Sequence, residues 1–172
     1  MVADPNTLPR LPLAIRPYPS QWETEIDIAG VGRVQFRPIR PSDEHLYAEF
    51  FTKVTVEDRR LRFFGAGPDL SHGFLARLTQ IDYAREMAYV AIEPNRGALL
   101  GVVRMVADPD YERAEYAILV RSDLKGRGLD WLLMRWLIDY AKHEGMQELS
   151  GSVLAGNVTM PSARLHHQVR SG

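Results

Sequence analysis

The stretch that most restricts the fold runs from residue 114 to residue 141, where an apolar strand passes through a glycine turn into an amphipathic helix. Ala114–Val120 is apolar apart from Glu115, and Lys125-Gly-Arg-Gly128 follows it. The helix after the turn places apolar residues at helical spacing: Leu129, Leu132, Leu133, Trp136, Leu137, Tyr140 and Ala141. Gly145 stands where a residue that ends this helix is expected. A strand, a short loop and a helix in this order predict an α/β layered domain.

Further strands are indicated on both sides of this unit. Trp22–Ile28 and Val34–Arg40 alternate with period two around a turn at residues 29–32, which predicts a hairpin. Pro38 lacks a backbone N–H and places the second strand at an edge or at a bulge. The other strand-like runs are Met87–Ile92, Leu99–Ala107, Ala114–Val120 and Glu148–Leu154.

Three shorter helices are predicted between the hairpin and the central strands. Ser42 is a plausible N-cap for a helix that carries Leu46, Tyr47 and Phe50 on one side. Residues 55–64 give a weaker helical signal. Ser71 is expected to cap a helix with Phe74, Leu75 and Leu78 on one face.

The two ends of the chain differ from its middle. Seven of the 11 prolines lie within the first 41 residues, so residues 1–20 are expected to form an extended arm or linker. Residues 21–160 form the predicted domain, and residues 161–172 form a tail. Pro161 fits the first turn of a helix but not its interior.

Composition excludes several classes of protein. A net charge of −1 argues against a generic nucleic-acid binder, which usually carries a basic excess. The absence of cysteine excludes disulfides and thiolate chemistry. No signal peptide and no membrane-spanning stretch is indicated, so a cytoplasmic location is expected.

The glycine turn is suited to binding a phosphate group. Glycine lets the backbone approach an anion closely, and the following helix offers unpaired N–H groups at its positive end. Lys125 and Arg127 add positive charge. The alternative is a solvated basic turn, because the four residues alone do not distinguish the two.

Glu115 is the one carboxylate in the apolar run. If the strand buries it, desolvation raises its pKa toward the range of a general base. If it faces water or pairs with Arg113 or Arg104, it is an ordinary surface residue. Both interpretations fit the residues alone.

Together these features resemble the GNAT superfamily of acyltransferases. Its loop pattern, Gln/Arg-x-x-Gly-x-Gly/Ala, falls here on residues 125–130. Longer segments are similar to the acetyltransferase domain of bacterial Pat-type protein lysine acetyltransferases, which also occurs fused to ADP-forming acyl-CoA synthetases. These segments are Val34–Glu44, Arg59–Gly65, Leu78–Tyr83 and Ala107–Ala117, and Leu13–Pro19 resembles the joint of the fusions.

The resemblance implies a GNAT fold, which is a mixed, mostly antiparallel sheet with helices on both faces, and an acetyl-CoA-dependent N-acetyltransferase without a metal. Glu115 matches the general base that acts on a substrate lysine, and the main-chain N–H near Val120 would stabilise the developing oxyanion. A protein with an acceptor lysine is the implied partner, and an acyl-CoA synthetase is one candidate. The implied cofactor contacts are Leu119, Val120, Lys125, Gly126, Arg127, Gly128, Leu129, Asp130 and Asn157.

Two departures from the family pattern leave other functions open. Asp130 replaces the last small residue of the loop and puts a carboxylate near the expected pyrophosphate, so weaker binding of CoA and impaired activity are expected. The tail does not match the closing strands of the family, which indicates a truncated or altered carboxyl end. The alternatives are a degenerate domain that binds or senses acyl-CoA without turnover, and an interaction domain of a larger protein. The adjacent His166 and His167 are not expected to form a metal site, because neighbouring helix residues point in different directions and no carboxylate stands nearby in the sequence.

Overall fold

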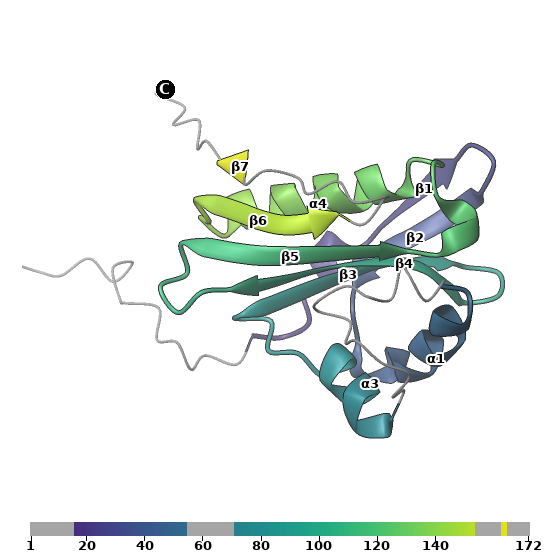
Figure 1. The fold of residues 1–172 in the computed structure, drawn as a ribbon, viewed down its shortest axis with the longest axis horizontal. Coiled ribbons are helices and arrows are strands. Elements are labelled where there is room, and N and C mark those ends of the chain that lie inside the picture. The colour runs from purple at the N-terminus through teal and green to yellow at the C-terminus, as the bar shows by residue number, and fades with distance from the viewer. Residues whose placement is uncertain (1–15, 55–70, 154–162, 165–172) are drawn as a thin grey trace, which may run out of the picture.

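The fold is a single twisted sheet with helices on both faces (Figure 1). The computed structural model describes residues 16–54, 71–153 and 163–164. The strands lie in sequence order: β1 (Thr24–Ile28), β2 (Gly32–Pro38), β3 (Glu86–Glu93), β4 (Ala98–Ala107), β5 (Arg113–Val120), β6 (Glu148–Val153) and β7 (Ala163–Arg164). Among the described strands, β5 and β6 pair in parallel, and the other neighbours are antiparallel. The predicted fold class is confirmed.

The described helices occupy opposite sides of this sheet. Helix α4 (Leu129–His143) crosses one face, and α1 (Glu44–Thr52) and α3 (His72–Thr79) cover the other (Figure 1). The described residues also form short 3₁₀ turns at Ser20–Trp22, Pro41–Asp43 and Ser122–Leu124. The prediction of a helix within residues 55–64 lies outside the described residues.

Two apolar layers form because β3, β4 and β5 are buried on both faces. Leu129, Leu133 and Leu137 of α4 pack into the first layer, and Tyr47, Phe50 and Phe51 of α1 pack into the second. Each such side chain contributes about 1.5–3 kcal/mol on full burial. Gly101 of β4 admits α4 closely, since a Cβ there would lie 3.1 Å from Leu133 Cδ1. This close packing fixes the helix that begins at the glycine turn.

The start of α1 differs from the prediction by one residue. Its N-cap is Asp43, and Ser42 belongs to the preceding 3₁₀ turn. The buried Asp43 carboxylate accepts hydrogen bonds from Arg37 at 2.6 and 2.7 Å and from the backbone N–H of Arg40 at 2.7 Å. This contact with β2 sets the position of the helix start, which local capping preferences alone do not reveal. Ser71 caps α3 as predicted, accepting from the N–H of Phe74.

The predicted hairpin is confirmed as β1 and β2, but β2 lies between β1 and β3 and is therefore not an edge strand. Pro38 is tolerated because the pairing of β1 with β2 ends at Thr24 and Phe36, two residues before the proline. Pro38 therefore lies beyond the last β1 pair, where no ladder bond to β1 requires its N–H.

The part of the predicted arm that the structure describes packs against the domain. Arg16 pairs with Glu144 after α4 at 2.9 Å. Trp22 lies edge-on to Tyr140 and Trp136, with ring centroids 5.5 and 6.2 Å away. Residues 16–22 are therefore held on the surface of the domain and do not extend away from it.

Candidate active site

The loop between β5 and α4 lies at the carboxyl end of β5, as the sequence predicted. Gly126 and Gly128 have φ angles of 79° and 84°, and Gly128 is the N-cap of α4. This left-handed conformation costs a residue with a side chain roughly 1–2 kcal/mol. The two glycines are therefore required by the backbone path, because the space around a Cβ at either position is open.

Several backbone N–H groups of this loop are available to a ligand. Among the described residues, the N–H groups of Gly126, Gly128, Leu129 and Asp130 have no hydrogen-bond partner. Gly128, Leu129 and Asp130 form the amino end of α4, where the helix dipole adds a partial positive charge. The group has the chemistry of an anion site, and a pyrophosphate fits it better than a neutral group does.

The basic side chains of the loop take different directions. Lys125 and Arg127 are both exposed. Arg127 extends to the hairpin between β1 and β2, since a Cβ at Gly30 would lie 2.5 Å from Arg127 Nη1. Arg121 donates to both carboxylate oxygens of Asp123 at 2.6 and 2.8 Å, and this contact lowers the pKa of Asp123.

The described pairing of β5 with β6 runs from Arg113 and Glu148 to Ile118 and Val153. The two residues of β5 that follow, Leu119 and Val120, pair with Val102 and Gly101 of β4. The N–H of Arg121 bonds to Leu100 of the β4 side at 2.9 Å. Since successive residues of a strand point their N–H groups to opposite neighbours, the N–H of Val120 points toward the β6 side. That N–H is therefore directed away from β4, toward the side of the sheet on which β6 lies.

Glu115 lies on β5, four residues before Leu119, and it is exposed. The interpretation that the strand buries it is wrong, because the start of β5 extends past α1 and α3 (Figure 1). Arg113 approaches Glu148, and Arg104 approaches Glu86, both at 3.8 Å. Neither arginine is paired with Glu115 in the described part of the chain.

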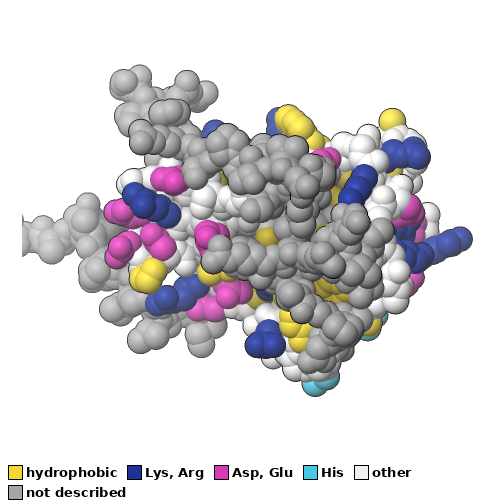
Figure 2. All heavy atoms as spheres, viewed as in Figure 1, with side chains coloured by type: hydrophobic (Ala, Val, Ile, Leu, Met, Phe, Trp, Pro, Cys, Tyr) yellow, Lys and Arg dark blue, Asp and Glu magenta, His cyan; other side chains and the backbone are white. Residues whose placement is uncertain are grey.

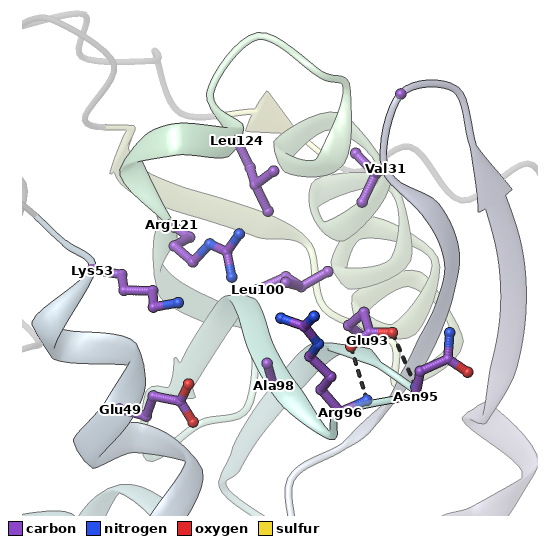
Figure 3. A pocket seen from close by; sticks show the side chains of 11 residues that line it. Val31, Glu49, Lys53, Glu93, Asn95, Arg96, Ala98, Leu100, Arg121 and Leu124 are labelled. Carbon is purple, nitrogen blue, oxygen red and sulfur yellow. Dashed lines mark hydrogen bonds between the residues drawn. The ribbon is translucent and has the colours of Figure 1, made fainter.

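A charged hollow of about 530 Å³ adjoins the loop (Figure 3). Arg121 and Leu124 of the loop, Lys53 at the end of α1, and Arg96 in the β3–β4 turn contribute to its wall. The carboxylate of Glu93 accepts hydrogen bonds from the backbone N–H groups of Asn95 and Arg96, and these bonds stabilise the turn. The hollow lies on the β4 side of β5, since Ala98 and Leu100 of β4 contribute to its wall.

The sequence analysis did not predict the charged hollow, and it did not identify Trp131 of α4 as a candidate functional residue. Arg121, Lys53 and Arg96 come from distant segments, and no local pattern joins them. Trp131 offered a signal, because it falls outside the apolar stripe of its helix, and its side chain is 62% exposed. Asn157, His166 and His167, which were named from the sequence, lie outside the described residues. Of the residues that the structure describes, no three acidic or histidine side chains come together as a metal site would require.

Basic and acidic side chains are interspersed over the described part of the face in Figure 2. Within the described ranges, no helix has the length and apolar character needed to cross a membrane.

The fold and the loop together define an acetyltransferase. Residues 33–167 match the family described as "Acetyltransferase (GNAT) domain". The chain belongs to this family, whose members transfer an acetyl group and use acetyl-CoA as co-substrate.

Two relatives and one solved structure show which members of this family the chain is similar to. An acetyltransferase of Pseudomonas aeruginosa is 33% identical over 129 residues, which cover 74% of this chain and 69% of that protein. The acetyltransferase Pat of Mycolicibacterium smegmatis is 29% identical over 125 residues, which cover 72% of this chain and 37% of Pat. The crystal structure of the GNAT domain of S. lividans PAT superposes with a TM-score of 0.71 at 27% identity, covering 82% of this chain and 84% of that domain. The similarity to Pat-type domains is therefore confirmed.

Proposed function

We propose that this domain transfers the acetyl group of acetyl-CoA to the side-chain amine of a protein lysine. The observation that carries the proposal is the set of unpartnered N–H groups at Gly126, Gly128, Leu129 and Asp130. The chain that carries these N–H groups belongs to a family that uses acetyl-CoA. The similarity to Pat-type acetyltransferases supports a protein acceptor, and an acyl-CoA synthetase is a candidate protein substrate.

In this proposal the backbone of residues 125–130 holds the pyrophosphate, and the side chains of Lys125 and Arg127 add positive charge. Asn157 and the main chain of Leu119 contribute further contacts. The N–H of Val120 donates to the thioester oxygen, where negative charge develops as the amine attacks. The new bond joins the lysine nitrogen to the acetyl carbon, the carbon–sulfur bond breaks, and CoA leaves as the thiol.

Glu115 takes the proton from the lysine ammonium, whose usual pKa of ~10.4 keeps it protonated at neutral pH. Glu115 and Val120 are five strand residues apart, which corresponds to roughly 17 Å. The proton is therefore relayed through water rather than by direct contact at the thioester. The exposure of Glu115 gives water access to it.

Steady-state release of CoA tests the proposal. The protein is mixed with acetyl-CoA and a lysine-containing protein, and thiol release is followed together with mass spectrometry of the acceptor. We expect thiol release that depends on the acceptor and an added acetyl group on a lysine. Acetylation that appears only on a small amine, and on no protein lysine, would contradict the protein acceptor.

Binding of acyl-CoA without turnover is the second candidate. Asp130, which places a carboxylate among the N–H groups of the loop, favours it, because like charges there weaken the hold on a pyrophosphate. Saturable binding of acetyl-CoA without thiol release, with or without an acceptor, would support this function over the first.

A further inference from the structure

Trp131 combines high exposure with a position beside the loop. It is the exposed large hydrophobic residue among those that the structure describes, at 62%. It is the third residue of α4, three residues after Gly128. Single exposed apolar residues are common on proteins, so exposure alone says little. The position of Trp131 at the start of α4 and its contact with Arg135 give this residue further meaning.

The direction of the Trp131 side chain follows from helix geometry. Leu129, Leu133 and Leu137 of α4 face the sheet and are fully buried. Trp131 is two residues, or about 200°, from Leu129 around the helix, so it lies on the outer face. Helical side chains lean toward the amino end of their helix, so the indole covers the first turn and the loop before it.

Arg135 lies one turn further along the same face of α4. Its Cζ is 5.6 Å from the centroid of the Trp131 ring, within the range of a cation–π contact. This contact limits the orientations that the indole adopts and places a positive charge next to it. Most of the ring surface still faces solvent.

The inference rests on the proposed function, in which the pyrophosphate of acyl-CoA lies on the N–H groups that open α4. One ribose links that pyrophosphate to the adenine, so the base lies close to the start of α4 and not along the rest of the helix. Trp131 is the aromatic surface at that place. We infer that the adenine ring of acyl-CoA stacks on Trp131, and that Arg135 pairs with the 3′-phosphate of the same ligand.

Calorimetric dissociation constants for two ligands test the stacking. Acetyl-CoA carries the adenosine, and S-acetyl-4′-phosphopantetheine lacks it. Trp131→Ala is expected to weaken acetyl-CoA about 5-fold or more, as loss of a base–aromatic stack does, and to leave the shorter ligand unchanged. Trp131→Phe, which keeps a ring, is expected to retain most of the affinity. Lys142→Ala, an exposed residue in the last turn of α4, is the control and should change neither constant.

The role of Arg135 has its own comparison. Arg135→Gln is expected to weaken acetyl-CoA but not its dephospho form, which lacks the 3′-phosphate. Equal weakening of both forms would overturn the phosphate contact.

The outcomes separate the inference from the function on which it rests. Unchanged affinity of Trp131→Ala for acetyl-CoA, while the unsubstituted protein binds it, overturns the stacking alone. Equal weakening of both ligands also overturns it, because the effect then belongs to the loop. An unsubstituted protein that binds no acetyl-CoA overturns the proposed function itself.

Discussion

At the scale of single residues, two carboxylates have opposite effects in the proposed function. Glu115 is exposed on β5, and Asp130 is in the first turn of α4. In the proposed function, the carboxylate of Glu115 takes the proton that leaves the acceptor amine. The carboxylate of Asp130 complements the dipole of α4 but repels an anion bound at the start of this helix.

Replacing Glu115 by Gln is expected to lower kcat/KM about 100-fold or more and to leave the affinity for acetyl-CoA unchanged, because only proton transfer is lost. The defect should shrink as the pH rises toward ~10.4, where the acceptor lysine is already deprotonated. A pH profile of turnover measures both effects. Glu112→Gln, in the exposed turn before β5, is the matched control. Full turnover of Glu115→Gln at neutral pH would remove Glu115 from the mechanism.

Replacing Asp130 by Gly is expected to raise the affinity for acetyl-CoA, because a negative charge beside the pyrophosphate is removed. The free protein should become less stable, since α4 loses a favourable charge in its first turn and gains a flexible residue. Calorimetry and urea unfolding report the two quantities. Asp139→Gly, exposed in the middle of α4, should lower stability without any gain in affinity. An unchanged affinity of Asp130→Gly would show that this carboxylate does not oppose the ligand.

At the scale of elements, the start of α4 and the start of α1 are fixed in different ways. The first depends on the backbone conformation of Gly128, which has φ of 84°. The second depends on the buried pair of Asp43 with Arg37. Substitution of Gly128 is therefore expected to strain the backbone, whereas substitution of Asp43 is expected to leave a buried charge without its partner.

Gly128→Ala is expected to cost roughly 1 kcal/mol of stability or more, because its left-handed conformation disfavours a Cβ. Gly73, inside α3, is the matched position, with no strained φ and open space around a Cβ. Gly73→Ala is expected to raise stability by some tenths of a kcal/mol through helix propensity. Thermal unfolding of both variants should therefore show shifts of opposite sign. Shifts of the same sign would contradict the conformational argument.

Asp43→Ala is expected to cost about 3–5 kcal/mol, because it leaves the guanidinium of Arg37 buried without its partner. The two side chains are 4% and 7% exposed. Glu25→Ala removes the partner of Arg33 in an exposed pair and should change stability by no more than about 0.5 kcal/mol. Chemical denaturation measures both differences. Equal effects would show that burial does not distinguish the two pairs.

At the scale of the whole molecule, ligand binding should be visible as stability. At 100 times its dissociation constant, acetyl-CoA is expected to stabilise the domain by about 2.7 kcal/mol. For a chain of this size, that corresponds to a rise in Tm of roughly 5–10 °C. Thermal scans with acetyl-CoA, and with acetate as control, measure it. No shift at saturating acetyl-CoA would favour an interaction domain over both acyl-CoA functions.

Sequence periodicity predicted the elements whose formation depends on local pattern. The apolar stripe of α4, the hairpin of β1 and β2, and the Ser71 cap are of this kind. The start of α1 was misplaced, because Asp43 is held by Arg37, six residues earlier on β2. The charged hollow was not predicted, since its wall joins α1, the β3–β4 turn and the loop. The exposure of Glu115 depends on how far the helices extend over the sheet, which periodicity does not encode.

The contact between Gly30 and Arg127 restricts how the chain can be engineered. Exposed hairpin tips are usual places for an inserted tag or an added residue. Here the tip lies against a side chain of the candidate cofactor loop, nearly 100 positions away in the sequence. A peptide inserted at this turn would displace Arg127 and reach the proposed acetyl-CoA site, so affinity tags and labels belong elsewhere on this protein.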